Sequence, residues 1–461
     1  ADKTDTALVL ECVFPVTPRM GEDEVRGVVQ ATTTDMDEAQ MWTKVAALVV
    51  LPESFLQCSA TDDYNENSLK KATAERLAAA ELLYQCVENA VRGRDKHGRI
   101  RLLGGSTSSF TELNRRRPTA AALRGVTHGI NAIVHDADDE AVMRSVDTIP
   151  AITKTVRAAF PGLEYWLAPA SIGMRGNPFG VADPRADEGS RTPLTTNDPR
   201  RAGCFGAAYV VGLASHLLNK SLTCLGIGDI VGDRGHTSLE VAPPDDLAPL
   251  WAQASYHTSR HGRQRAGTVK YHPAFHVVRG FARACGSAVW DVQSSDTSRI
   301  RAVAFYKESA SGSRRGSIDP SRRRSGPSAA AIAAAALAAA AAAAEEEAKA
   351  AGETPPHPPA SASEGERKHP FIGEIWLSNM TAEAQNASVQ LGYKASFAVA
   401  LVDHTAATQH SDYDMAFMDQ TVSSMILSSS PDPSNLLLEL GPYAVARVVI
   451  SPHSLSLFAS A

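Results

Sequence analysis

Short apolar segments alternate with longer amphipathic segments along roughly the first 300 residues of the chain. The apolar segments predict six strands, at Ala7–Val13, Lys44–Pro52, Ile100–Gly104, Gly129–His135, Leu163–Pro169 and Ser221–Ile230. The segments between them predict helices at Ser68–Arg92, Asp139–Phe160 and Gly203–Asn219. Strands that are apolar along their whole length and separated by helices are typical of a parallel sheet buried on both faces. The pattern favours an α/β fold, as a barrel or as a doubly wound sheet.

From Ala288 onward the apolar segments are short, and turn residues separate them. This pattern predicts an antiparallel β domain. It is interrupted at 309–370 by an Ala-, Ser- and Pro-rich insertion with the alanine tract Ala329–Ala344, for which we expect a disordered loop. We therefore predict a barrel domain over 1–287 and a β domain over 288–461.

Composition narrows the function classes. Apolar residues make up 44% of the chain and charged residues 21%, and the net charge of −6 does not favour nucleic acid or an acidic membrane as a partner. No apolar segment is long enough to span a bilayer. The six cysteines form no C-x-x-C pair, and no G-x-G-x-x-G follows the first strand. We expect no cofactor, no metal and an intracellular, cytoplasmic location with reduced thiols. The oligomeric state is not predicted.

The first candidate site follows the third predicted strand. We expect the segment Arg101–Pro118 to be a buried strand whose end carries the sequence FTELNR. Glu112 there is a candidate acid or base, and Asn114 and Arg115 are candidates to hold substrate oxygens or to tune its pKa. The alternative is a structural Glu112 in a salt bridge.

Two further polar clusters follow the next strands. His135 is a candidate base or donor, with a structural histidine as the alternative. Arg175 is a candidate for binding a carboxylate or a pair of hydroxyls, with a backbone-bonded loop arginine as the alternative. Ends of parallel strands meet on one side of a barrel, so we expect these clusters to lie on that side.

Several segments resemble the D-apionate lactonase family, in the same order along the chain. They are GGSTSSFTELNRRRP at Gly104–Pro118, INAIVHDADD at Ile130–Asp139, LAPASIGMRGNP at Leu167–Pro178, DPRRAGCFGAAYVVG at Asp198–Gly212, YHPAFHVVRGF at Tyr271–Phe281 and WLSNMT at Trp376–Thr381.

The resemblance implies a TIM-like barrel followed by a C-terminal β domain, and hydrolysis of a sugar-acid lactone. It adds Asn177 and Arg200 to the substrate-binding candidates. It also implies an N-terminal β region and a first barrel strand, which we expect to precede Ala1. The sequence departs from the family where a glutamate follows the seventh strand, because that position is Gly226 here. Asp229 or Asp233 is the candidate replacement.

The leading hypothesis is a lactonase-type hydrolase acting on a sugar acid or carbohydrate. Lactone opening needs an activated water, a stabilised oxyanion and a protonated leaving alkoxide, and Glu112 with a second acid would divide these tasks. Two alternatives stay open. One is a catalytically impaired relative that binds a carbohydrate or a protein, and the other is a glycosidase-like hydrolase with two nearby carboxylates.

Overall fold

The structure is a computed structural model, and it divides into two compact units, which are described separately. The first comprises Ala1–Pro199 with His216–Gly235, and the second Arg200–Ser215 with His236–Ala461. The described residues are 8–55, 66–95, 97–175, 192–218, 222–231, 235–240, 268–290, 292–307, 372–391, 395–403, 426–427 and 435–452. The predicted insertion at 309–370 lies outside these ranges.

The first unit is built on a six-stranded parallel sheet in the order β1-β2-β3-β4-β5-β6. Its strands are β1 (Leu8–Phe14), β2 (Val45–Pro52), β3 (Arg101–Gly105), β4 (Gly125–Asn131), β5 (Glu164–Ser171) and β6 (Cys224–Ile227). Its helices are α1 (Glu22–Glu38), η1 (Glu53–Phe55), α2 (Glu66–Arg92), α3 (Phe110–Arg115), α4 (Asp139–Arg144), η2 (Ser145–Thr148) and α5 (Ile149–Ala159), and the short strand β7 (Asp229–Val231) follows β6.

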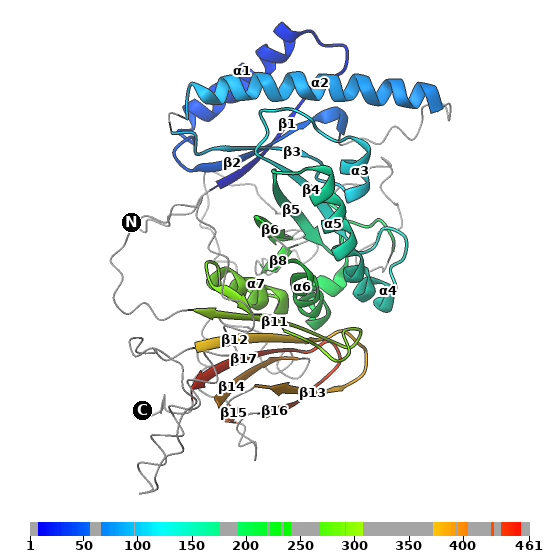
Figure 1. Cartoon of the computed structure of the whole chain (residues 1–461), viewed down its shortest axis with the longest axis vertical. Coiled ribbons are helices and arrows are strands. Elements are labelled where there is room, and N and C mark those ends of the chain that lie inside the picture. Colours follow the sequence, from blue (N-terminus) through cyan, green and yellow to red (C-terminus); the bar gives the residue numbers. More distant parts are fainter. Residues whose placement is uncertain are drawn as a thin grey trace, which may run out of the picture. The chain divides into compact units, whose positions relative to one another are not determined.

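Helices α1 and α2 lie over one face of β1–β3 (Figure 1). Apolar residues of α2 recur at helical spacing, with Ala80, Leu83, Tyr84 and Val87 buried against the sheet. The sequence did not predict α1, because its Thr32-Thr33-Thr34 run has low helix propensity. Burial of its apolar side against the sheet stabilises it instead, and the first-turn acids Glu22, Asp23 and Glu24 favour its N-terminus.

Several predicted elements needed correction. The predicted sixth strand, Ser221–Ile230, is divided into β6 and β7, which belong to different sheets, and the predicted helix Asp139–Phe160 is divided into α4, η2 and α5. The residues Phe110–Arg115 form the short helix α3 after β3, rather than the end of a strand that continues from Arg101. Ser109 has the extended backbone of an N-cap residue, and Glu112 and Arg115 suit the first and last turns of a helix.

The fourth strand is Gly125–Asn131, earlier in the chain than the predicted Gly129–His135. Ile133 is fully buried although it lies two residues after the end of this strand, so its burial comes from packing outside the strand. The apolar run alone could not separate these two kinds of burial.

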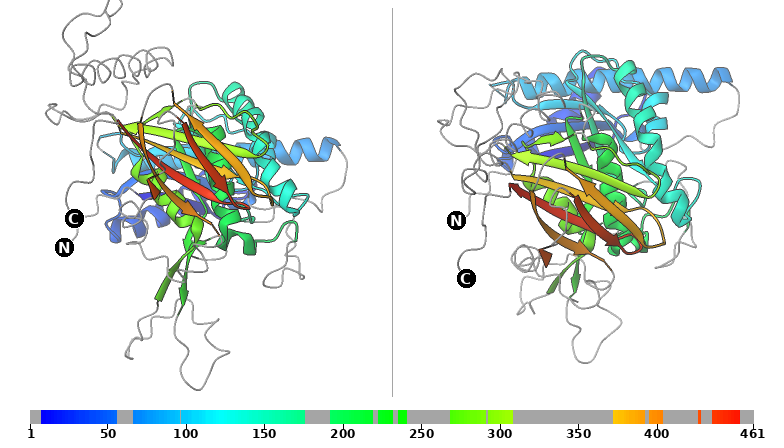
Figure 2. Two further views of the ribbon diagram at one scale, coloured as in Figure 1. Left: turned by 90° about the horizontal axis from the view of Figure 1, so that it is seen from below. Right: turned by 60° about the horizontal axis from the view of Figure 1, so that its bottom comes forward.

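The second unit contains helices and antiparallel sheets. The helical elements are η3 (Pro199–Ala202), which joins the two units, α6 (Cys204–Leu217), whose last residues belong to the first unit, and α7 (Pro273–Arg283). β8 (Gly235–Glu240) pairs with β9 (Thr268–Tyr271). A six-stranded sheet has the order β10-β11-β12-β17-β14-β15 (Figure 2). Its strands are β10 (Ala288–Trp290), β11 (Ile300–Lys307), β12 (Ile372–Asn379), β14 (Ala395–Val402), β15 (Ile426–Leu427) and β17 (Val445–Pro452). β13 (Gln385–Gln390) and β16 (Asn435–Leu440) form a separate antiparallel pair.

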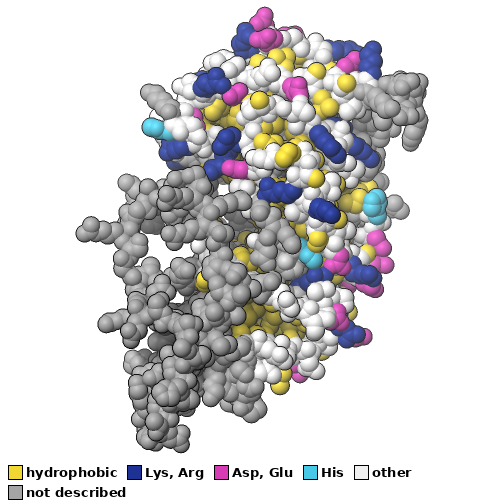
Figure 3. Space-filling model, in the orientation of Figure 1, with side chains coloured by type: hydrophobic (Ala, Val, Ile, Leu, Met, Phe, Trp, Pro, Cys, Tyr) yellow, Lys and Arg dark blue, Asp and Glu magenta, His cyan; other side chains and the backbone are white. Residues whose placement is uncertain are grey.

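The predicted fold class is confirmed. A parallel β/α half-barrel precedes antiparallel β-sheets, and the latter have a core of their own that includes Ile375, Leu377, Val448 and Ile450. On the described part of the face in Figure 3, basic side chains lie among acidic ones rather than gathering by sign.

Candidate functional site

The pleat of β1 decides which side chains face the inside of the half-barrel. Leu10, Cys12 and Phe14 pack in the core formed with α1 and α2. The alternating positions, Glu11 and its neighbours at 9 and 13, therefore face the opposite, inner side. That side has a small core of its own, formed by Ala47, Val49, Leu51, Leu103 and Trp166. Val9 and Val13 are 47% and 44% exposed, so the inner face is open to solvent along β1.

The carboxyl ends of β3 and β4 approach each other closely. Gly105 has φ +134°, and a Cβ there would lie 2.1 Å from the carbonyl oxygen of Thr127, so this position requires glycine. The chain then crosses β4, where the Gly129 N–H donates to the carbonyl of Ser108 at 2.6 Å. Ser108 Oγ and Asn131 Oδ1 are buried without a hydrogen-bond partner among the described residues. Because buried polar atoms are normally paired, this strand end can accept a ligand or a water.

Glu112 lies on α3, directly after this crossing, and is 3% exposed. Its Oε1 accepts a hydrogen bond from Arg115 Nη1 at 2.5 Å, and its Oε2 lies 3.5 Å from Arg116 Nη2. Arg116 is itself buried, donates to the carbonyl oxygen of Phe55 at 3.0 Å and lies over the Phe55 ring. The carboxylate thus helps to fix α3 to the segment after β2. Its Oε2 accepts no hydrogen bond in the described structure.

The two other candidates on α3 differ from Glu112 in exposure. The Arg115 side chain is 58% exposed, so it can contact a ligand while it holds Glu112. Asn114 is also exposed, and its Oδ1 accepts hydrogen bonds from Arg117 Nε and Nη2 at 3.2 and 2.5 Å.

Arg175 follows β5 and forms an ion pair with Glu11 on the inner face of β1. The two side chains are 38% and 23% exposed. In a flat sheet, β1 and β5 would lie about 19 Å apart, at ~4.8 Å for each of the four steps between them. The curvature of the half-barrel and the segment after β5 therefore bring these two side chains together across the inner face. No sequence pattern singles out Glu11, because it occupies one polar position in an apolar strand.

The remaining predicted residues are dispersed. His135 is exposed, beyond the end of β4. Asp229 opens β7 and is half-buried, one residue after Gly228, whose φ is +54°. Arg200 is buried in the second unit, 4.9 Å from the centre of the Phe205 ring. Asn177 and Asp233 lie outside the described residues.

Gly226 lies close to a neighbouring strand. A Cβ at Gly226 would lie 2.8 Å from the Cβ of Ala168 on β5, which is closer than side-chain carbons pack. An acidic side chain therefore cannot occupy this position unless β5 and β6 shift. The structure thus gives a steric reason why glycine stands here.

A buried polar network that the sequence analysis missed lies behind the strand ends. The ring of His128 on β4 is fully buried, and its Nε2 lies 2.8 Å from the hydroxyl oxygen of Tyr165 on β5. Phe110, the first residue of α3, packs edge-on against the same ring with centroids 5.6 Å apart. Burial lowers the pKa of His128 to about 4, so the ring is neutral at pH 7. Alternation of polar and apolar residues within β4 offered no signal for this network.

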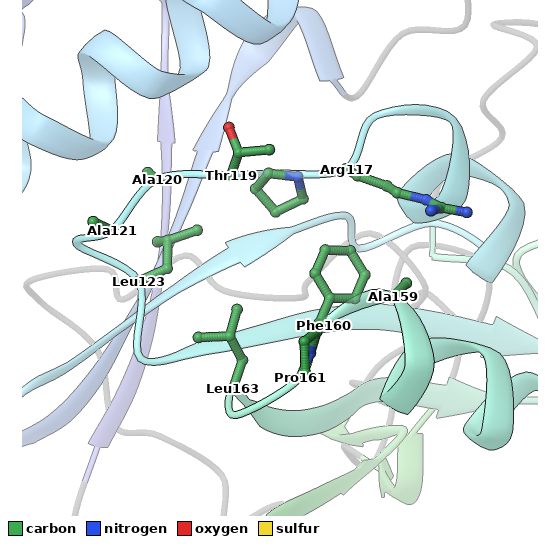
Figure 4. Close-up of a pocket in the computed structure, with 10 residues that line it drawn as sticks. Arg117, Thr119, Ala120, Ala121, Leu123, Ala159, Phe160, Pro161 and Leu163 are labelled. Atoms are coloured by element: carbon green, nitrogen blue, oxygen red, sulfur yellow. The ribbon is translucent and has the colours of Figure 1, made fainter.

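A cavity of about 420 Å³ lies at the amino ends of the parallel strands, away from Glu112 and the other carboxyl-end candidates (Figure 4). The loop before β4 and the loop before β5 form it, and Leu123, Phe160 and Leu163 line it together with Arg117. In β/α barrels the amino-end side contributes to stability, whereas active sites lie at the carboxyl ends.

No group of three or more His, Cys, Asp or Glu side chains in the described ranges is arranged to hold a metal ion. No described helix combines the length and apolar character needed to cross a membrane.

The chain is similar to several known proteins. Over 143 residues the chain is 38% identical to D-apionate lactonase of Brucella anthropi. The matched segment makes up 31% of this chain and 24% of that protein. The chain thus matches about a quarter of the length of this relative. Among solved structures it is similar to a conserved exported protein of Bacteroides fragilis, with 10% identity, a TM-score of 0.47 and coverage of 93% and 70% of the two chains. It is also similar to the GH51 arabinofuranosidase of Xanthomonas axonopodis pv. citri, with 8% identity, a TM-score of 0.46 and coverage of 94% and 74%.

The family model described as "D-apionate lactonase, TIM barrel domain" matches residues 1–286, which is more than half of the chain and contains the whole parallel sheet. The chain belongs to the D-apionate lactonase TIM barrel domain family.

Proposed function

We propose that the chain hydrolyses a sugar-acid lactone at the carboxyl ends of the parallel strands, with Glu112 as the general acid and base. Family membership supports the reaction class. The observation that supports Glu112 is its burial beside two arginines with Oε2 free of hydrogen bonds, directly after β3. A buried carboxylate oxygen without a donor is suited to accept a proton or a hydrogen bond from a bound molecule.

The reaction needs few parts. A water oxygen bonds to the lactone carbonyl carbon, the carbonyl becomes an oxyanion, and the bond to the ring oxygen then breaks as that oxygen takes up a proton. The product is the open hydroxy acid. In this proposal Glu112 takes the proton from water and returns it to the ring oxygen, while Arg115, Arg175 and Asn114 donate hydrogen bonds to substrate oxygens. His135 and Asn177 are further substrate-binding candidates. Asp229 and Asp233 are the candidates for a second acid.

A titration of released acid tests this proposal. Purified chain is incubated with D-apionolactone and a panel of aldonolactones at constant pH, and base uptake is recorded. We expect Glu112→Gln to reduce kcat by about 100-fold or more, in the range found for loss of a general acid or base. The matched control is Glu88→Gln, which removes the surface ion pair with Arg92 on α2 and leaves the rate unchanged. Equal rates for Glu112→Gln and the wild type would refute the catalytic assignment.

The crowding at Gly226 favours one alternative, a relative that binds a sugar acid without hydrolysing it. The family's glutamate is absent at this position, and Ala168 blocks its side-chain path. Calorimetry with D-apionate distinguishes the two functions. Tight binding together with no acid release from any lactone would favour the binding protein over the hydrolase.

A further inference from the structure

The ion pair between Glu11 and Arg175 is a contact across the inner face of the half-barrel. Only one N–H group of the Arg175 guanidinium has a partner among the described residues, the carboxylate of Glu11. A guanidinium has five N–H groups in a fork that matches a carboxylate. Glu11 therefore holds Arg175 through Nη1, and the other N–H groups of the guanidinium are available to a ligand. By contrast, Arg447 in the second unit forms a two-pronged pair, since its Nε and Nη2 both donate to the Glu374 carboxylate.

Glu11 is also an unusual residue for its place. Its neighbours on the inner face, at positions 9 and 13, are valines, and its register partner on β2 is Val49. A carboxylate among apolar side chains loses hydration unless a partner compensates. Arg175 is that partner, and both side chains keep contact with solvent. The pair is thus placed where a molecule on the inner face can reach it.

A second inner-face ion pair provides a comparison. Arg101 and Glu164 are the first residues of β3 and β5, and Arg101 Nε lies 3.1 Å from Glu164 Oε1. Their side chains are 36% and 29% exposed, close to the values of Glu11 and Arg175. The two pairs differ in location, because Arg101 and Glu164 occupy the amino ends of the strands and Arg175 follows the carboxyl end of β5. Active sites of β/α barrels lie at the carboxyl ends.

We propose that Glu11 is a positioning residue that holds Arg175 on the inner face, so that the free guanidinium donors bind hydroxyl oxygens that the sugar acid and its lactone share. The inference rests on the proposed function for the identity of the ligand. Glu11 acts through Arg175 and does not itself take part in proton transfer. It accordingly affects binding of substrate and product more than the chemical step.

Two variants and a control test the role of this pair in the full chain. Glu11→Gln keeps the size of the side chain and removes the charge that orients Arg175, and Arg175→Lys keeps the charge and removes the fork. We expect each to raise KM for the lactone, and the Kd for D-apionate measured by calorimetry, by about tenfold, with kcat changed less than twofold. Glu164→Gln breaks the matched pair at the amino ends and leaves KM and Kd unchanged.

The possible outcomes separate this inference from the proposed function. Unchanged KM and Kd in Glu11→Gln, in a chain whose hydrolysis depends on Glu112, would overturn the role of Glu11 and retain the lactonase. A tenfold weaker Kd in Glu11→Gln, in a chain that hydrolyses no lactone, would support the positioning role and overturn the hydrolase. Equal weakening by Glu11→Gln and Glu164→Gln would overturn the inference, because both pairs would then act only through the fold. Lack of D-apionate binding by the wild-type chain would also overturn it.

Discussion

Replacement of Glu112 by glutamine has a structural cost that can be worked out from its contacts. Glu112 and Arg116 have side chains 4% and 8% exposed, and Oε2 lies 3.5 Å from Nη2. Coulomb's law at an effective dielectric constant of about 20 gives roughly 5 kcal/mol for this separation. Arg115 adds less than about 1 kcal/mol, because its side chain is 58% exposed. Loss of one partner leaves the Arg116 charge buried, so we expect Glu112→Gln to destabilise the first unit by about 3 kcal/mol.

Hydrogen exchange of the segment from β3 to α3 measures this cost locally. A local measurement is needed because the chain has two units, whose unfolding a single global transition does not separate. We expect the free energy of opening of this segment, measured from its exchange rates, to fall by about 3 kcal/mol in Glu112→Gln. The double variant Glu112→Gln/Arg116→Met should recover at least about 1 kcal/mol, because it removes the unpaired buried charge. Protection in Glu112→Gln within about 0.5 kcal/mol of the wild type would refute the view that this ion pair fixes α3.

Three other predictions concern the interior. The pKa of His128 falls from 6.5 to about 4 on folding, so the unfolded chain binds the proton more readily. The free energy of unfolding of the first unit should therefore fall by up to about 3 kcal/mol as the pH drops from 6.5 to about 4. Hydrogen exchange measured over this pH range should show the fall in the wild type and not in His128→Gln. Gly280→Ala should lower the melting temperature despite its better helix propensity, because the new Cβ would lie 2.2 Å from the Trp376 ring; an unchanged or raised value would contradict this. Gly226→Ala should destabilise the first unit by about 1–3 kcal/mol, measured by exchange at β6, and Gly226→Ala/Ala168→Gly should restore it; a stable single variant would show that β5 and β6 separate easily.

The sequence by itself determined the elements that rest on local periodicity. The continuous apolar run of β2 and the long helical stripe of α2 were predicted close to their observed bounds. A strand buried on both faces needs apolar residues at nearly every position, and such a run can be recognised directly in the sequence. The sequence also placed Glu112 near the end of the third strand, although as part of that strand rather than on α3, and it showed that no acid occupies position 226.

Only the tertiary structure decided how the polar groups are paired. Glu11 looked like an isolated polar residue, and its ion pair with Arg175 joins residues 164 positions apart in sequence. The network of His128 with Tyr165 and the crowding of Gly226 by Ala168 likewise depend on neighbours from other strands. The burial of the Glu112–Arg116 pair depends on the contact of Arg116 with Phe55, which is distant in sequence. A side chain's chemistry depends on the groups that surround it, and curvature of the sheet and the loops after its strands bring those groups together. A periodic pattern along one segment contains no information about them.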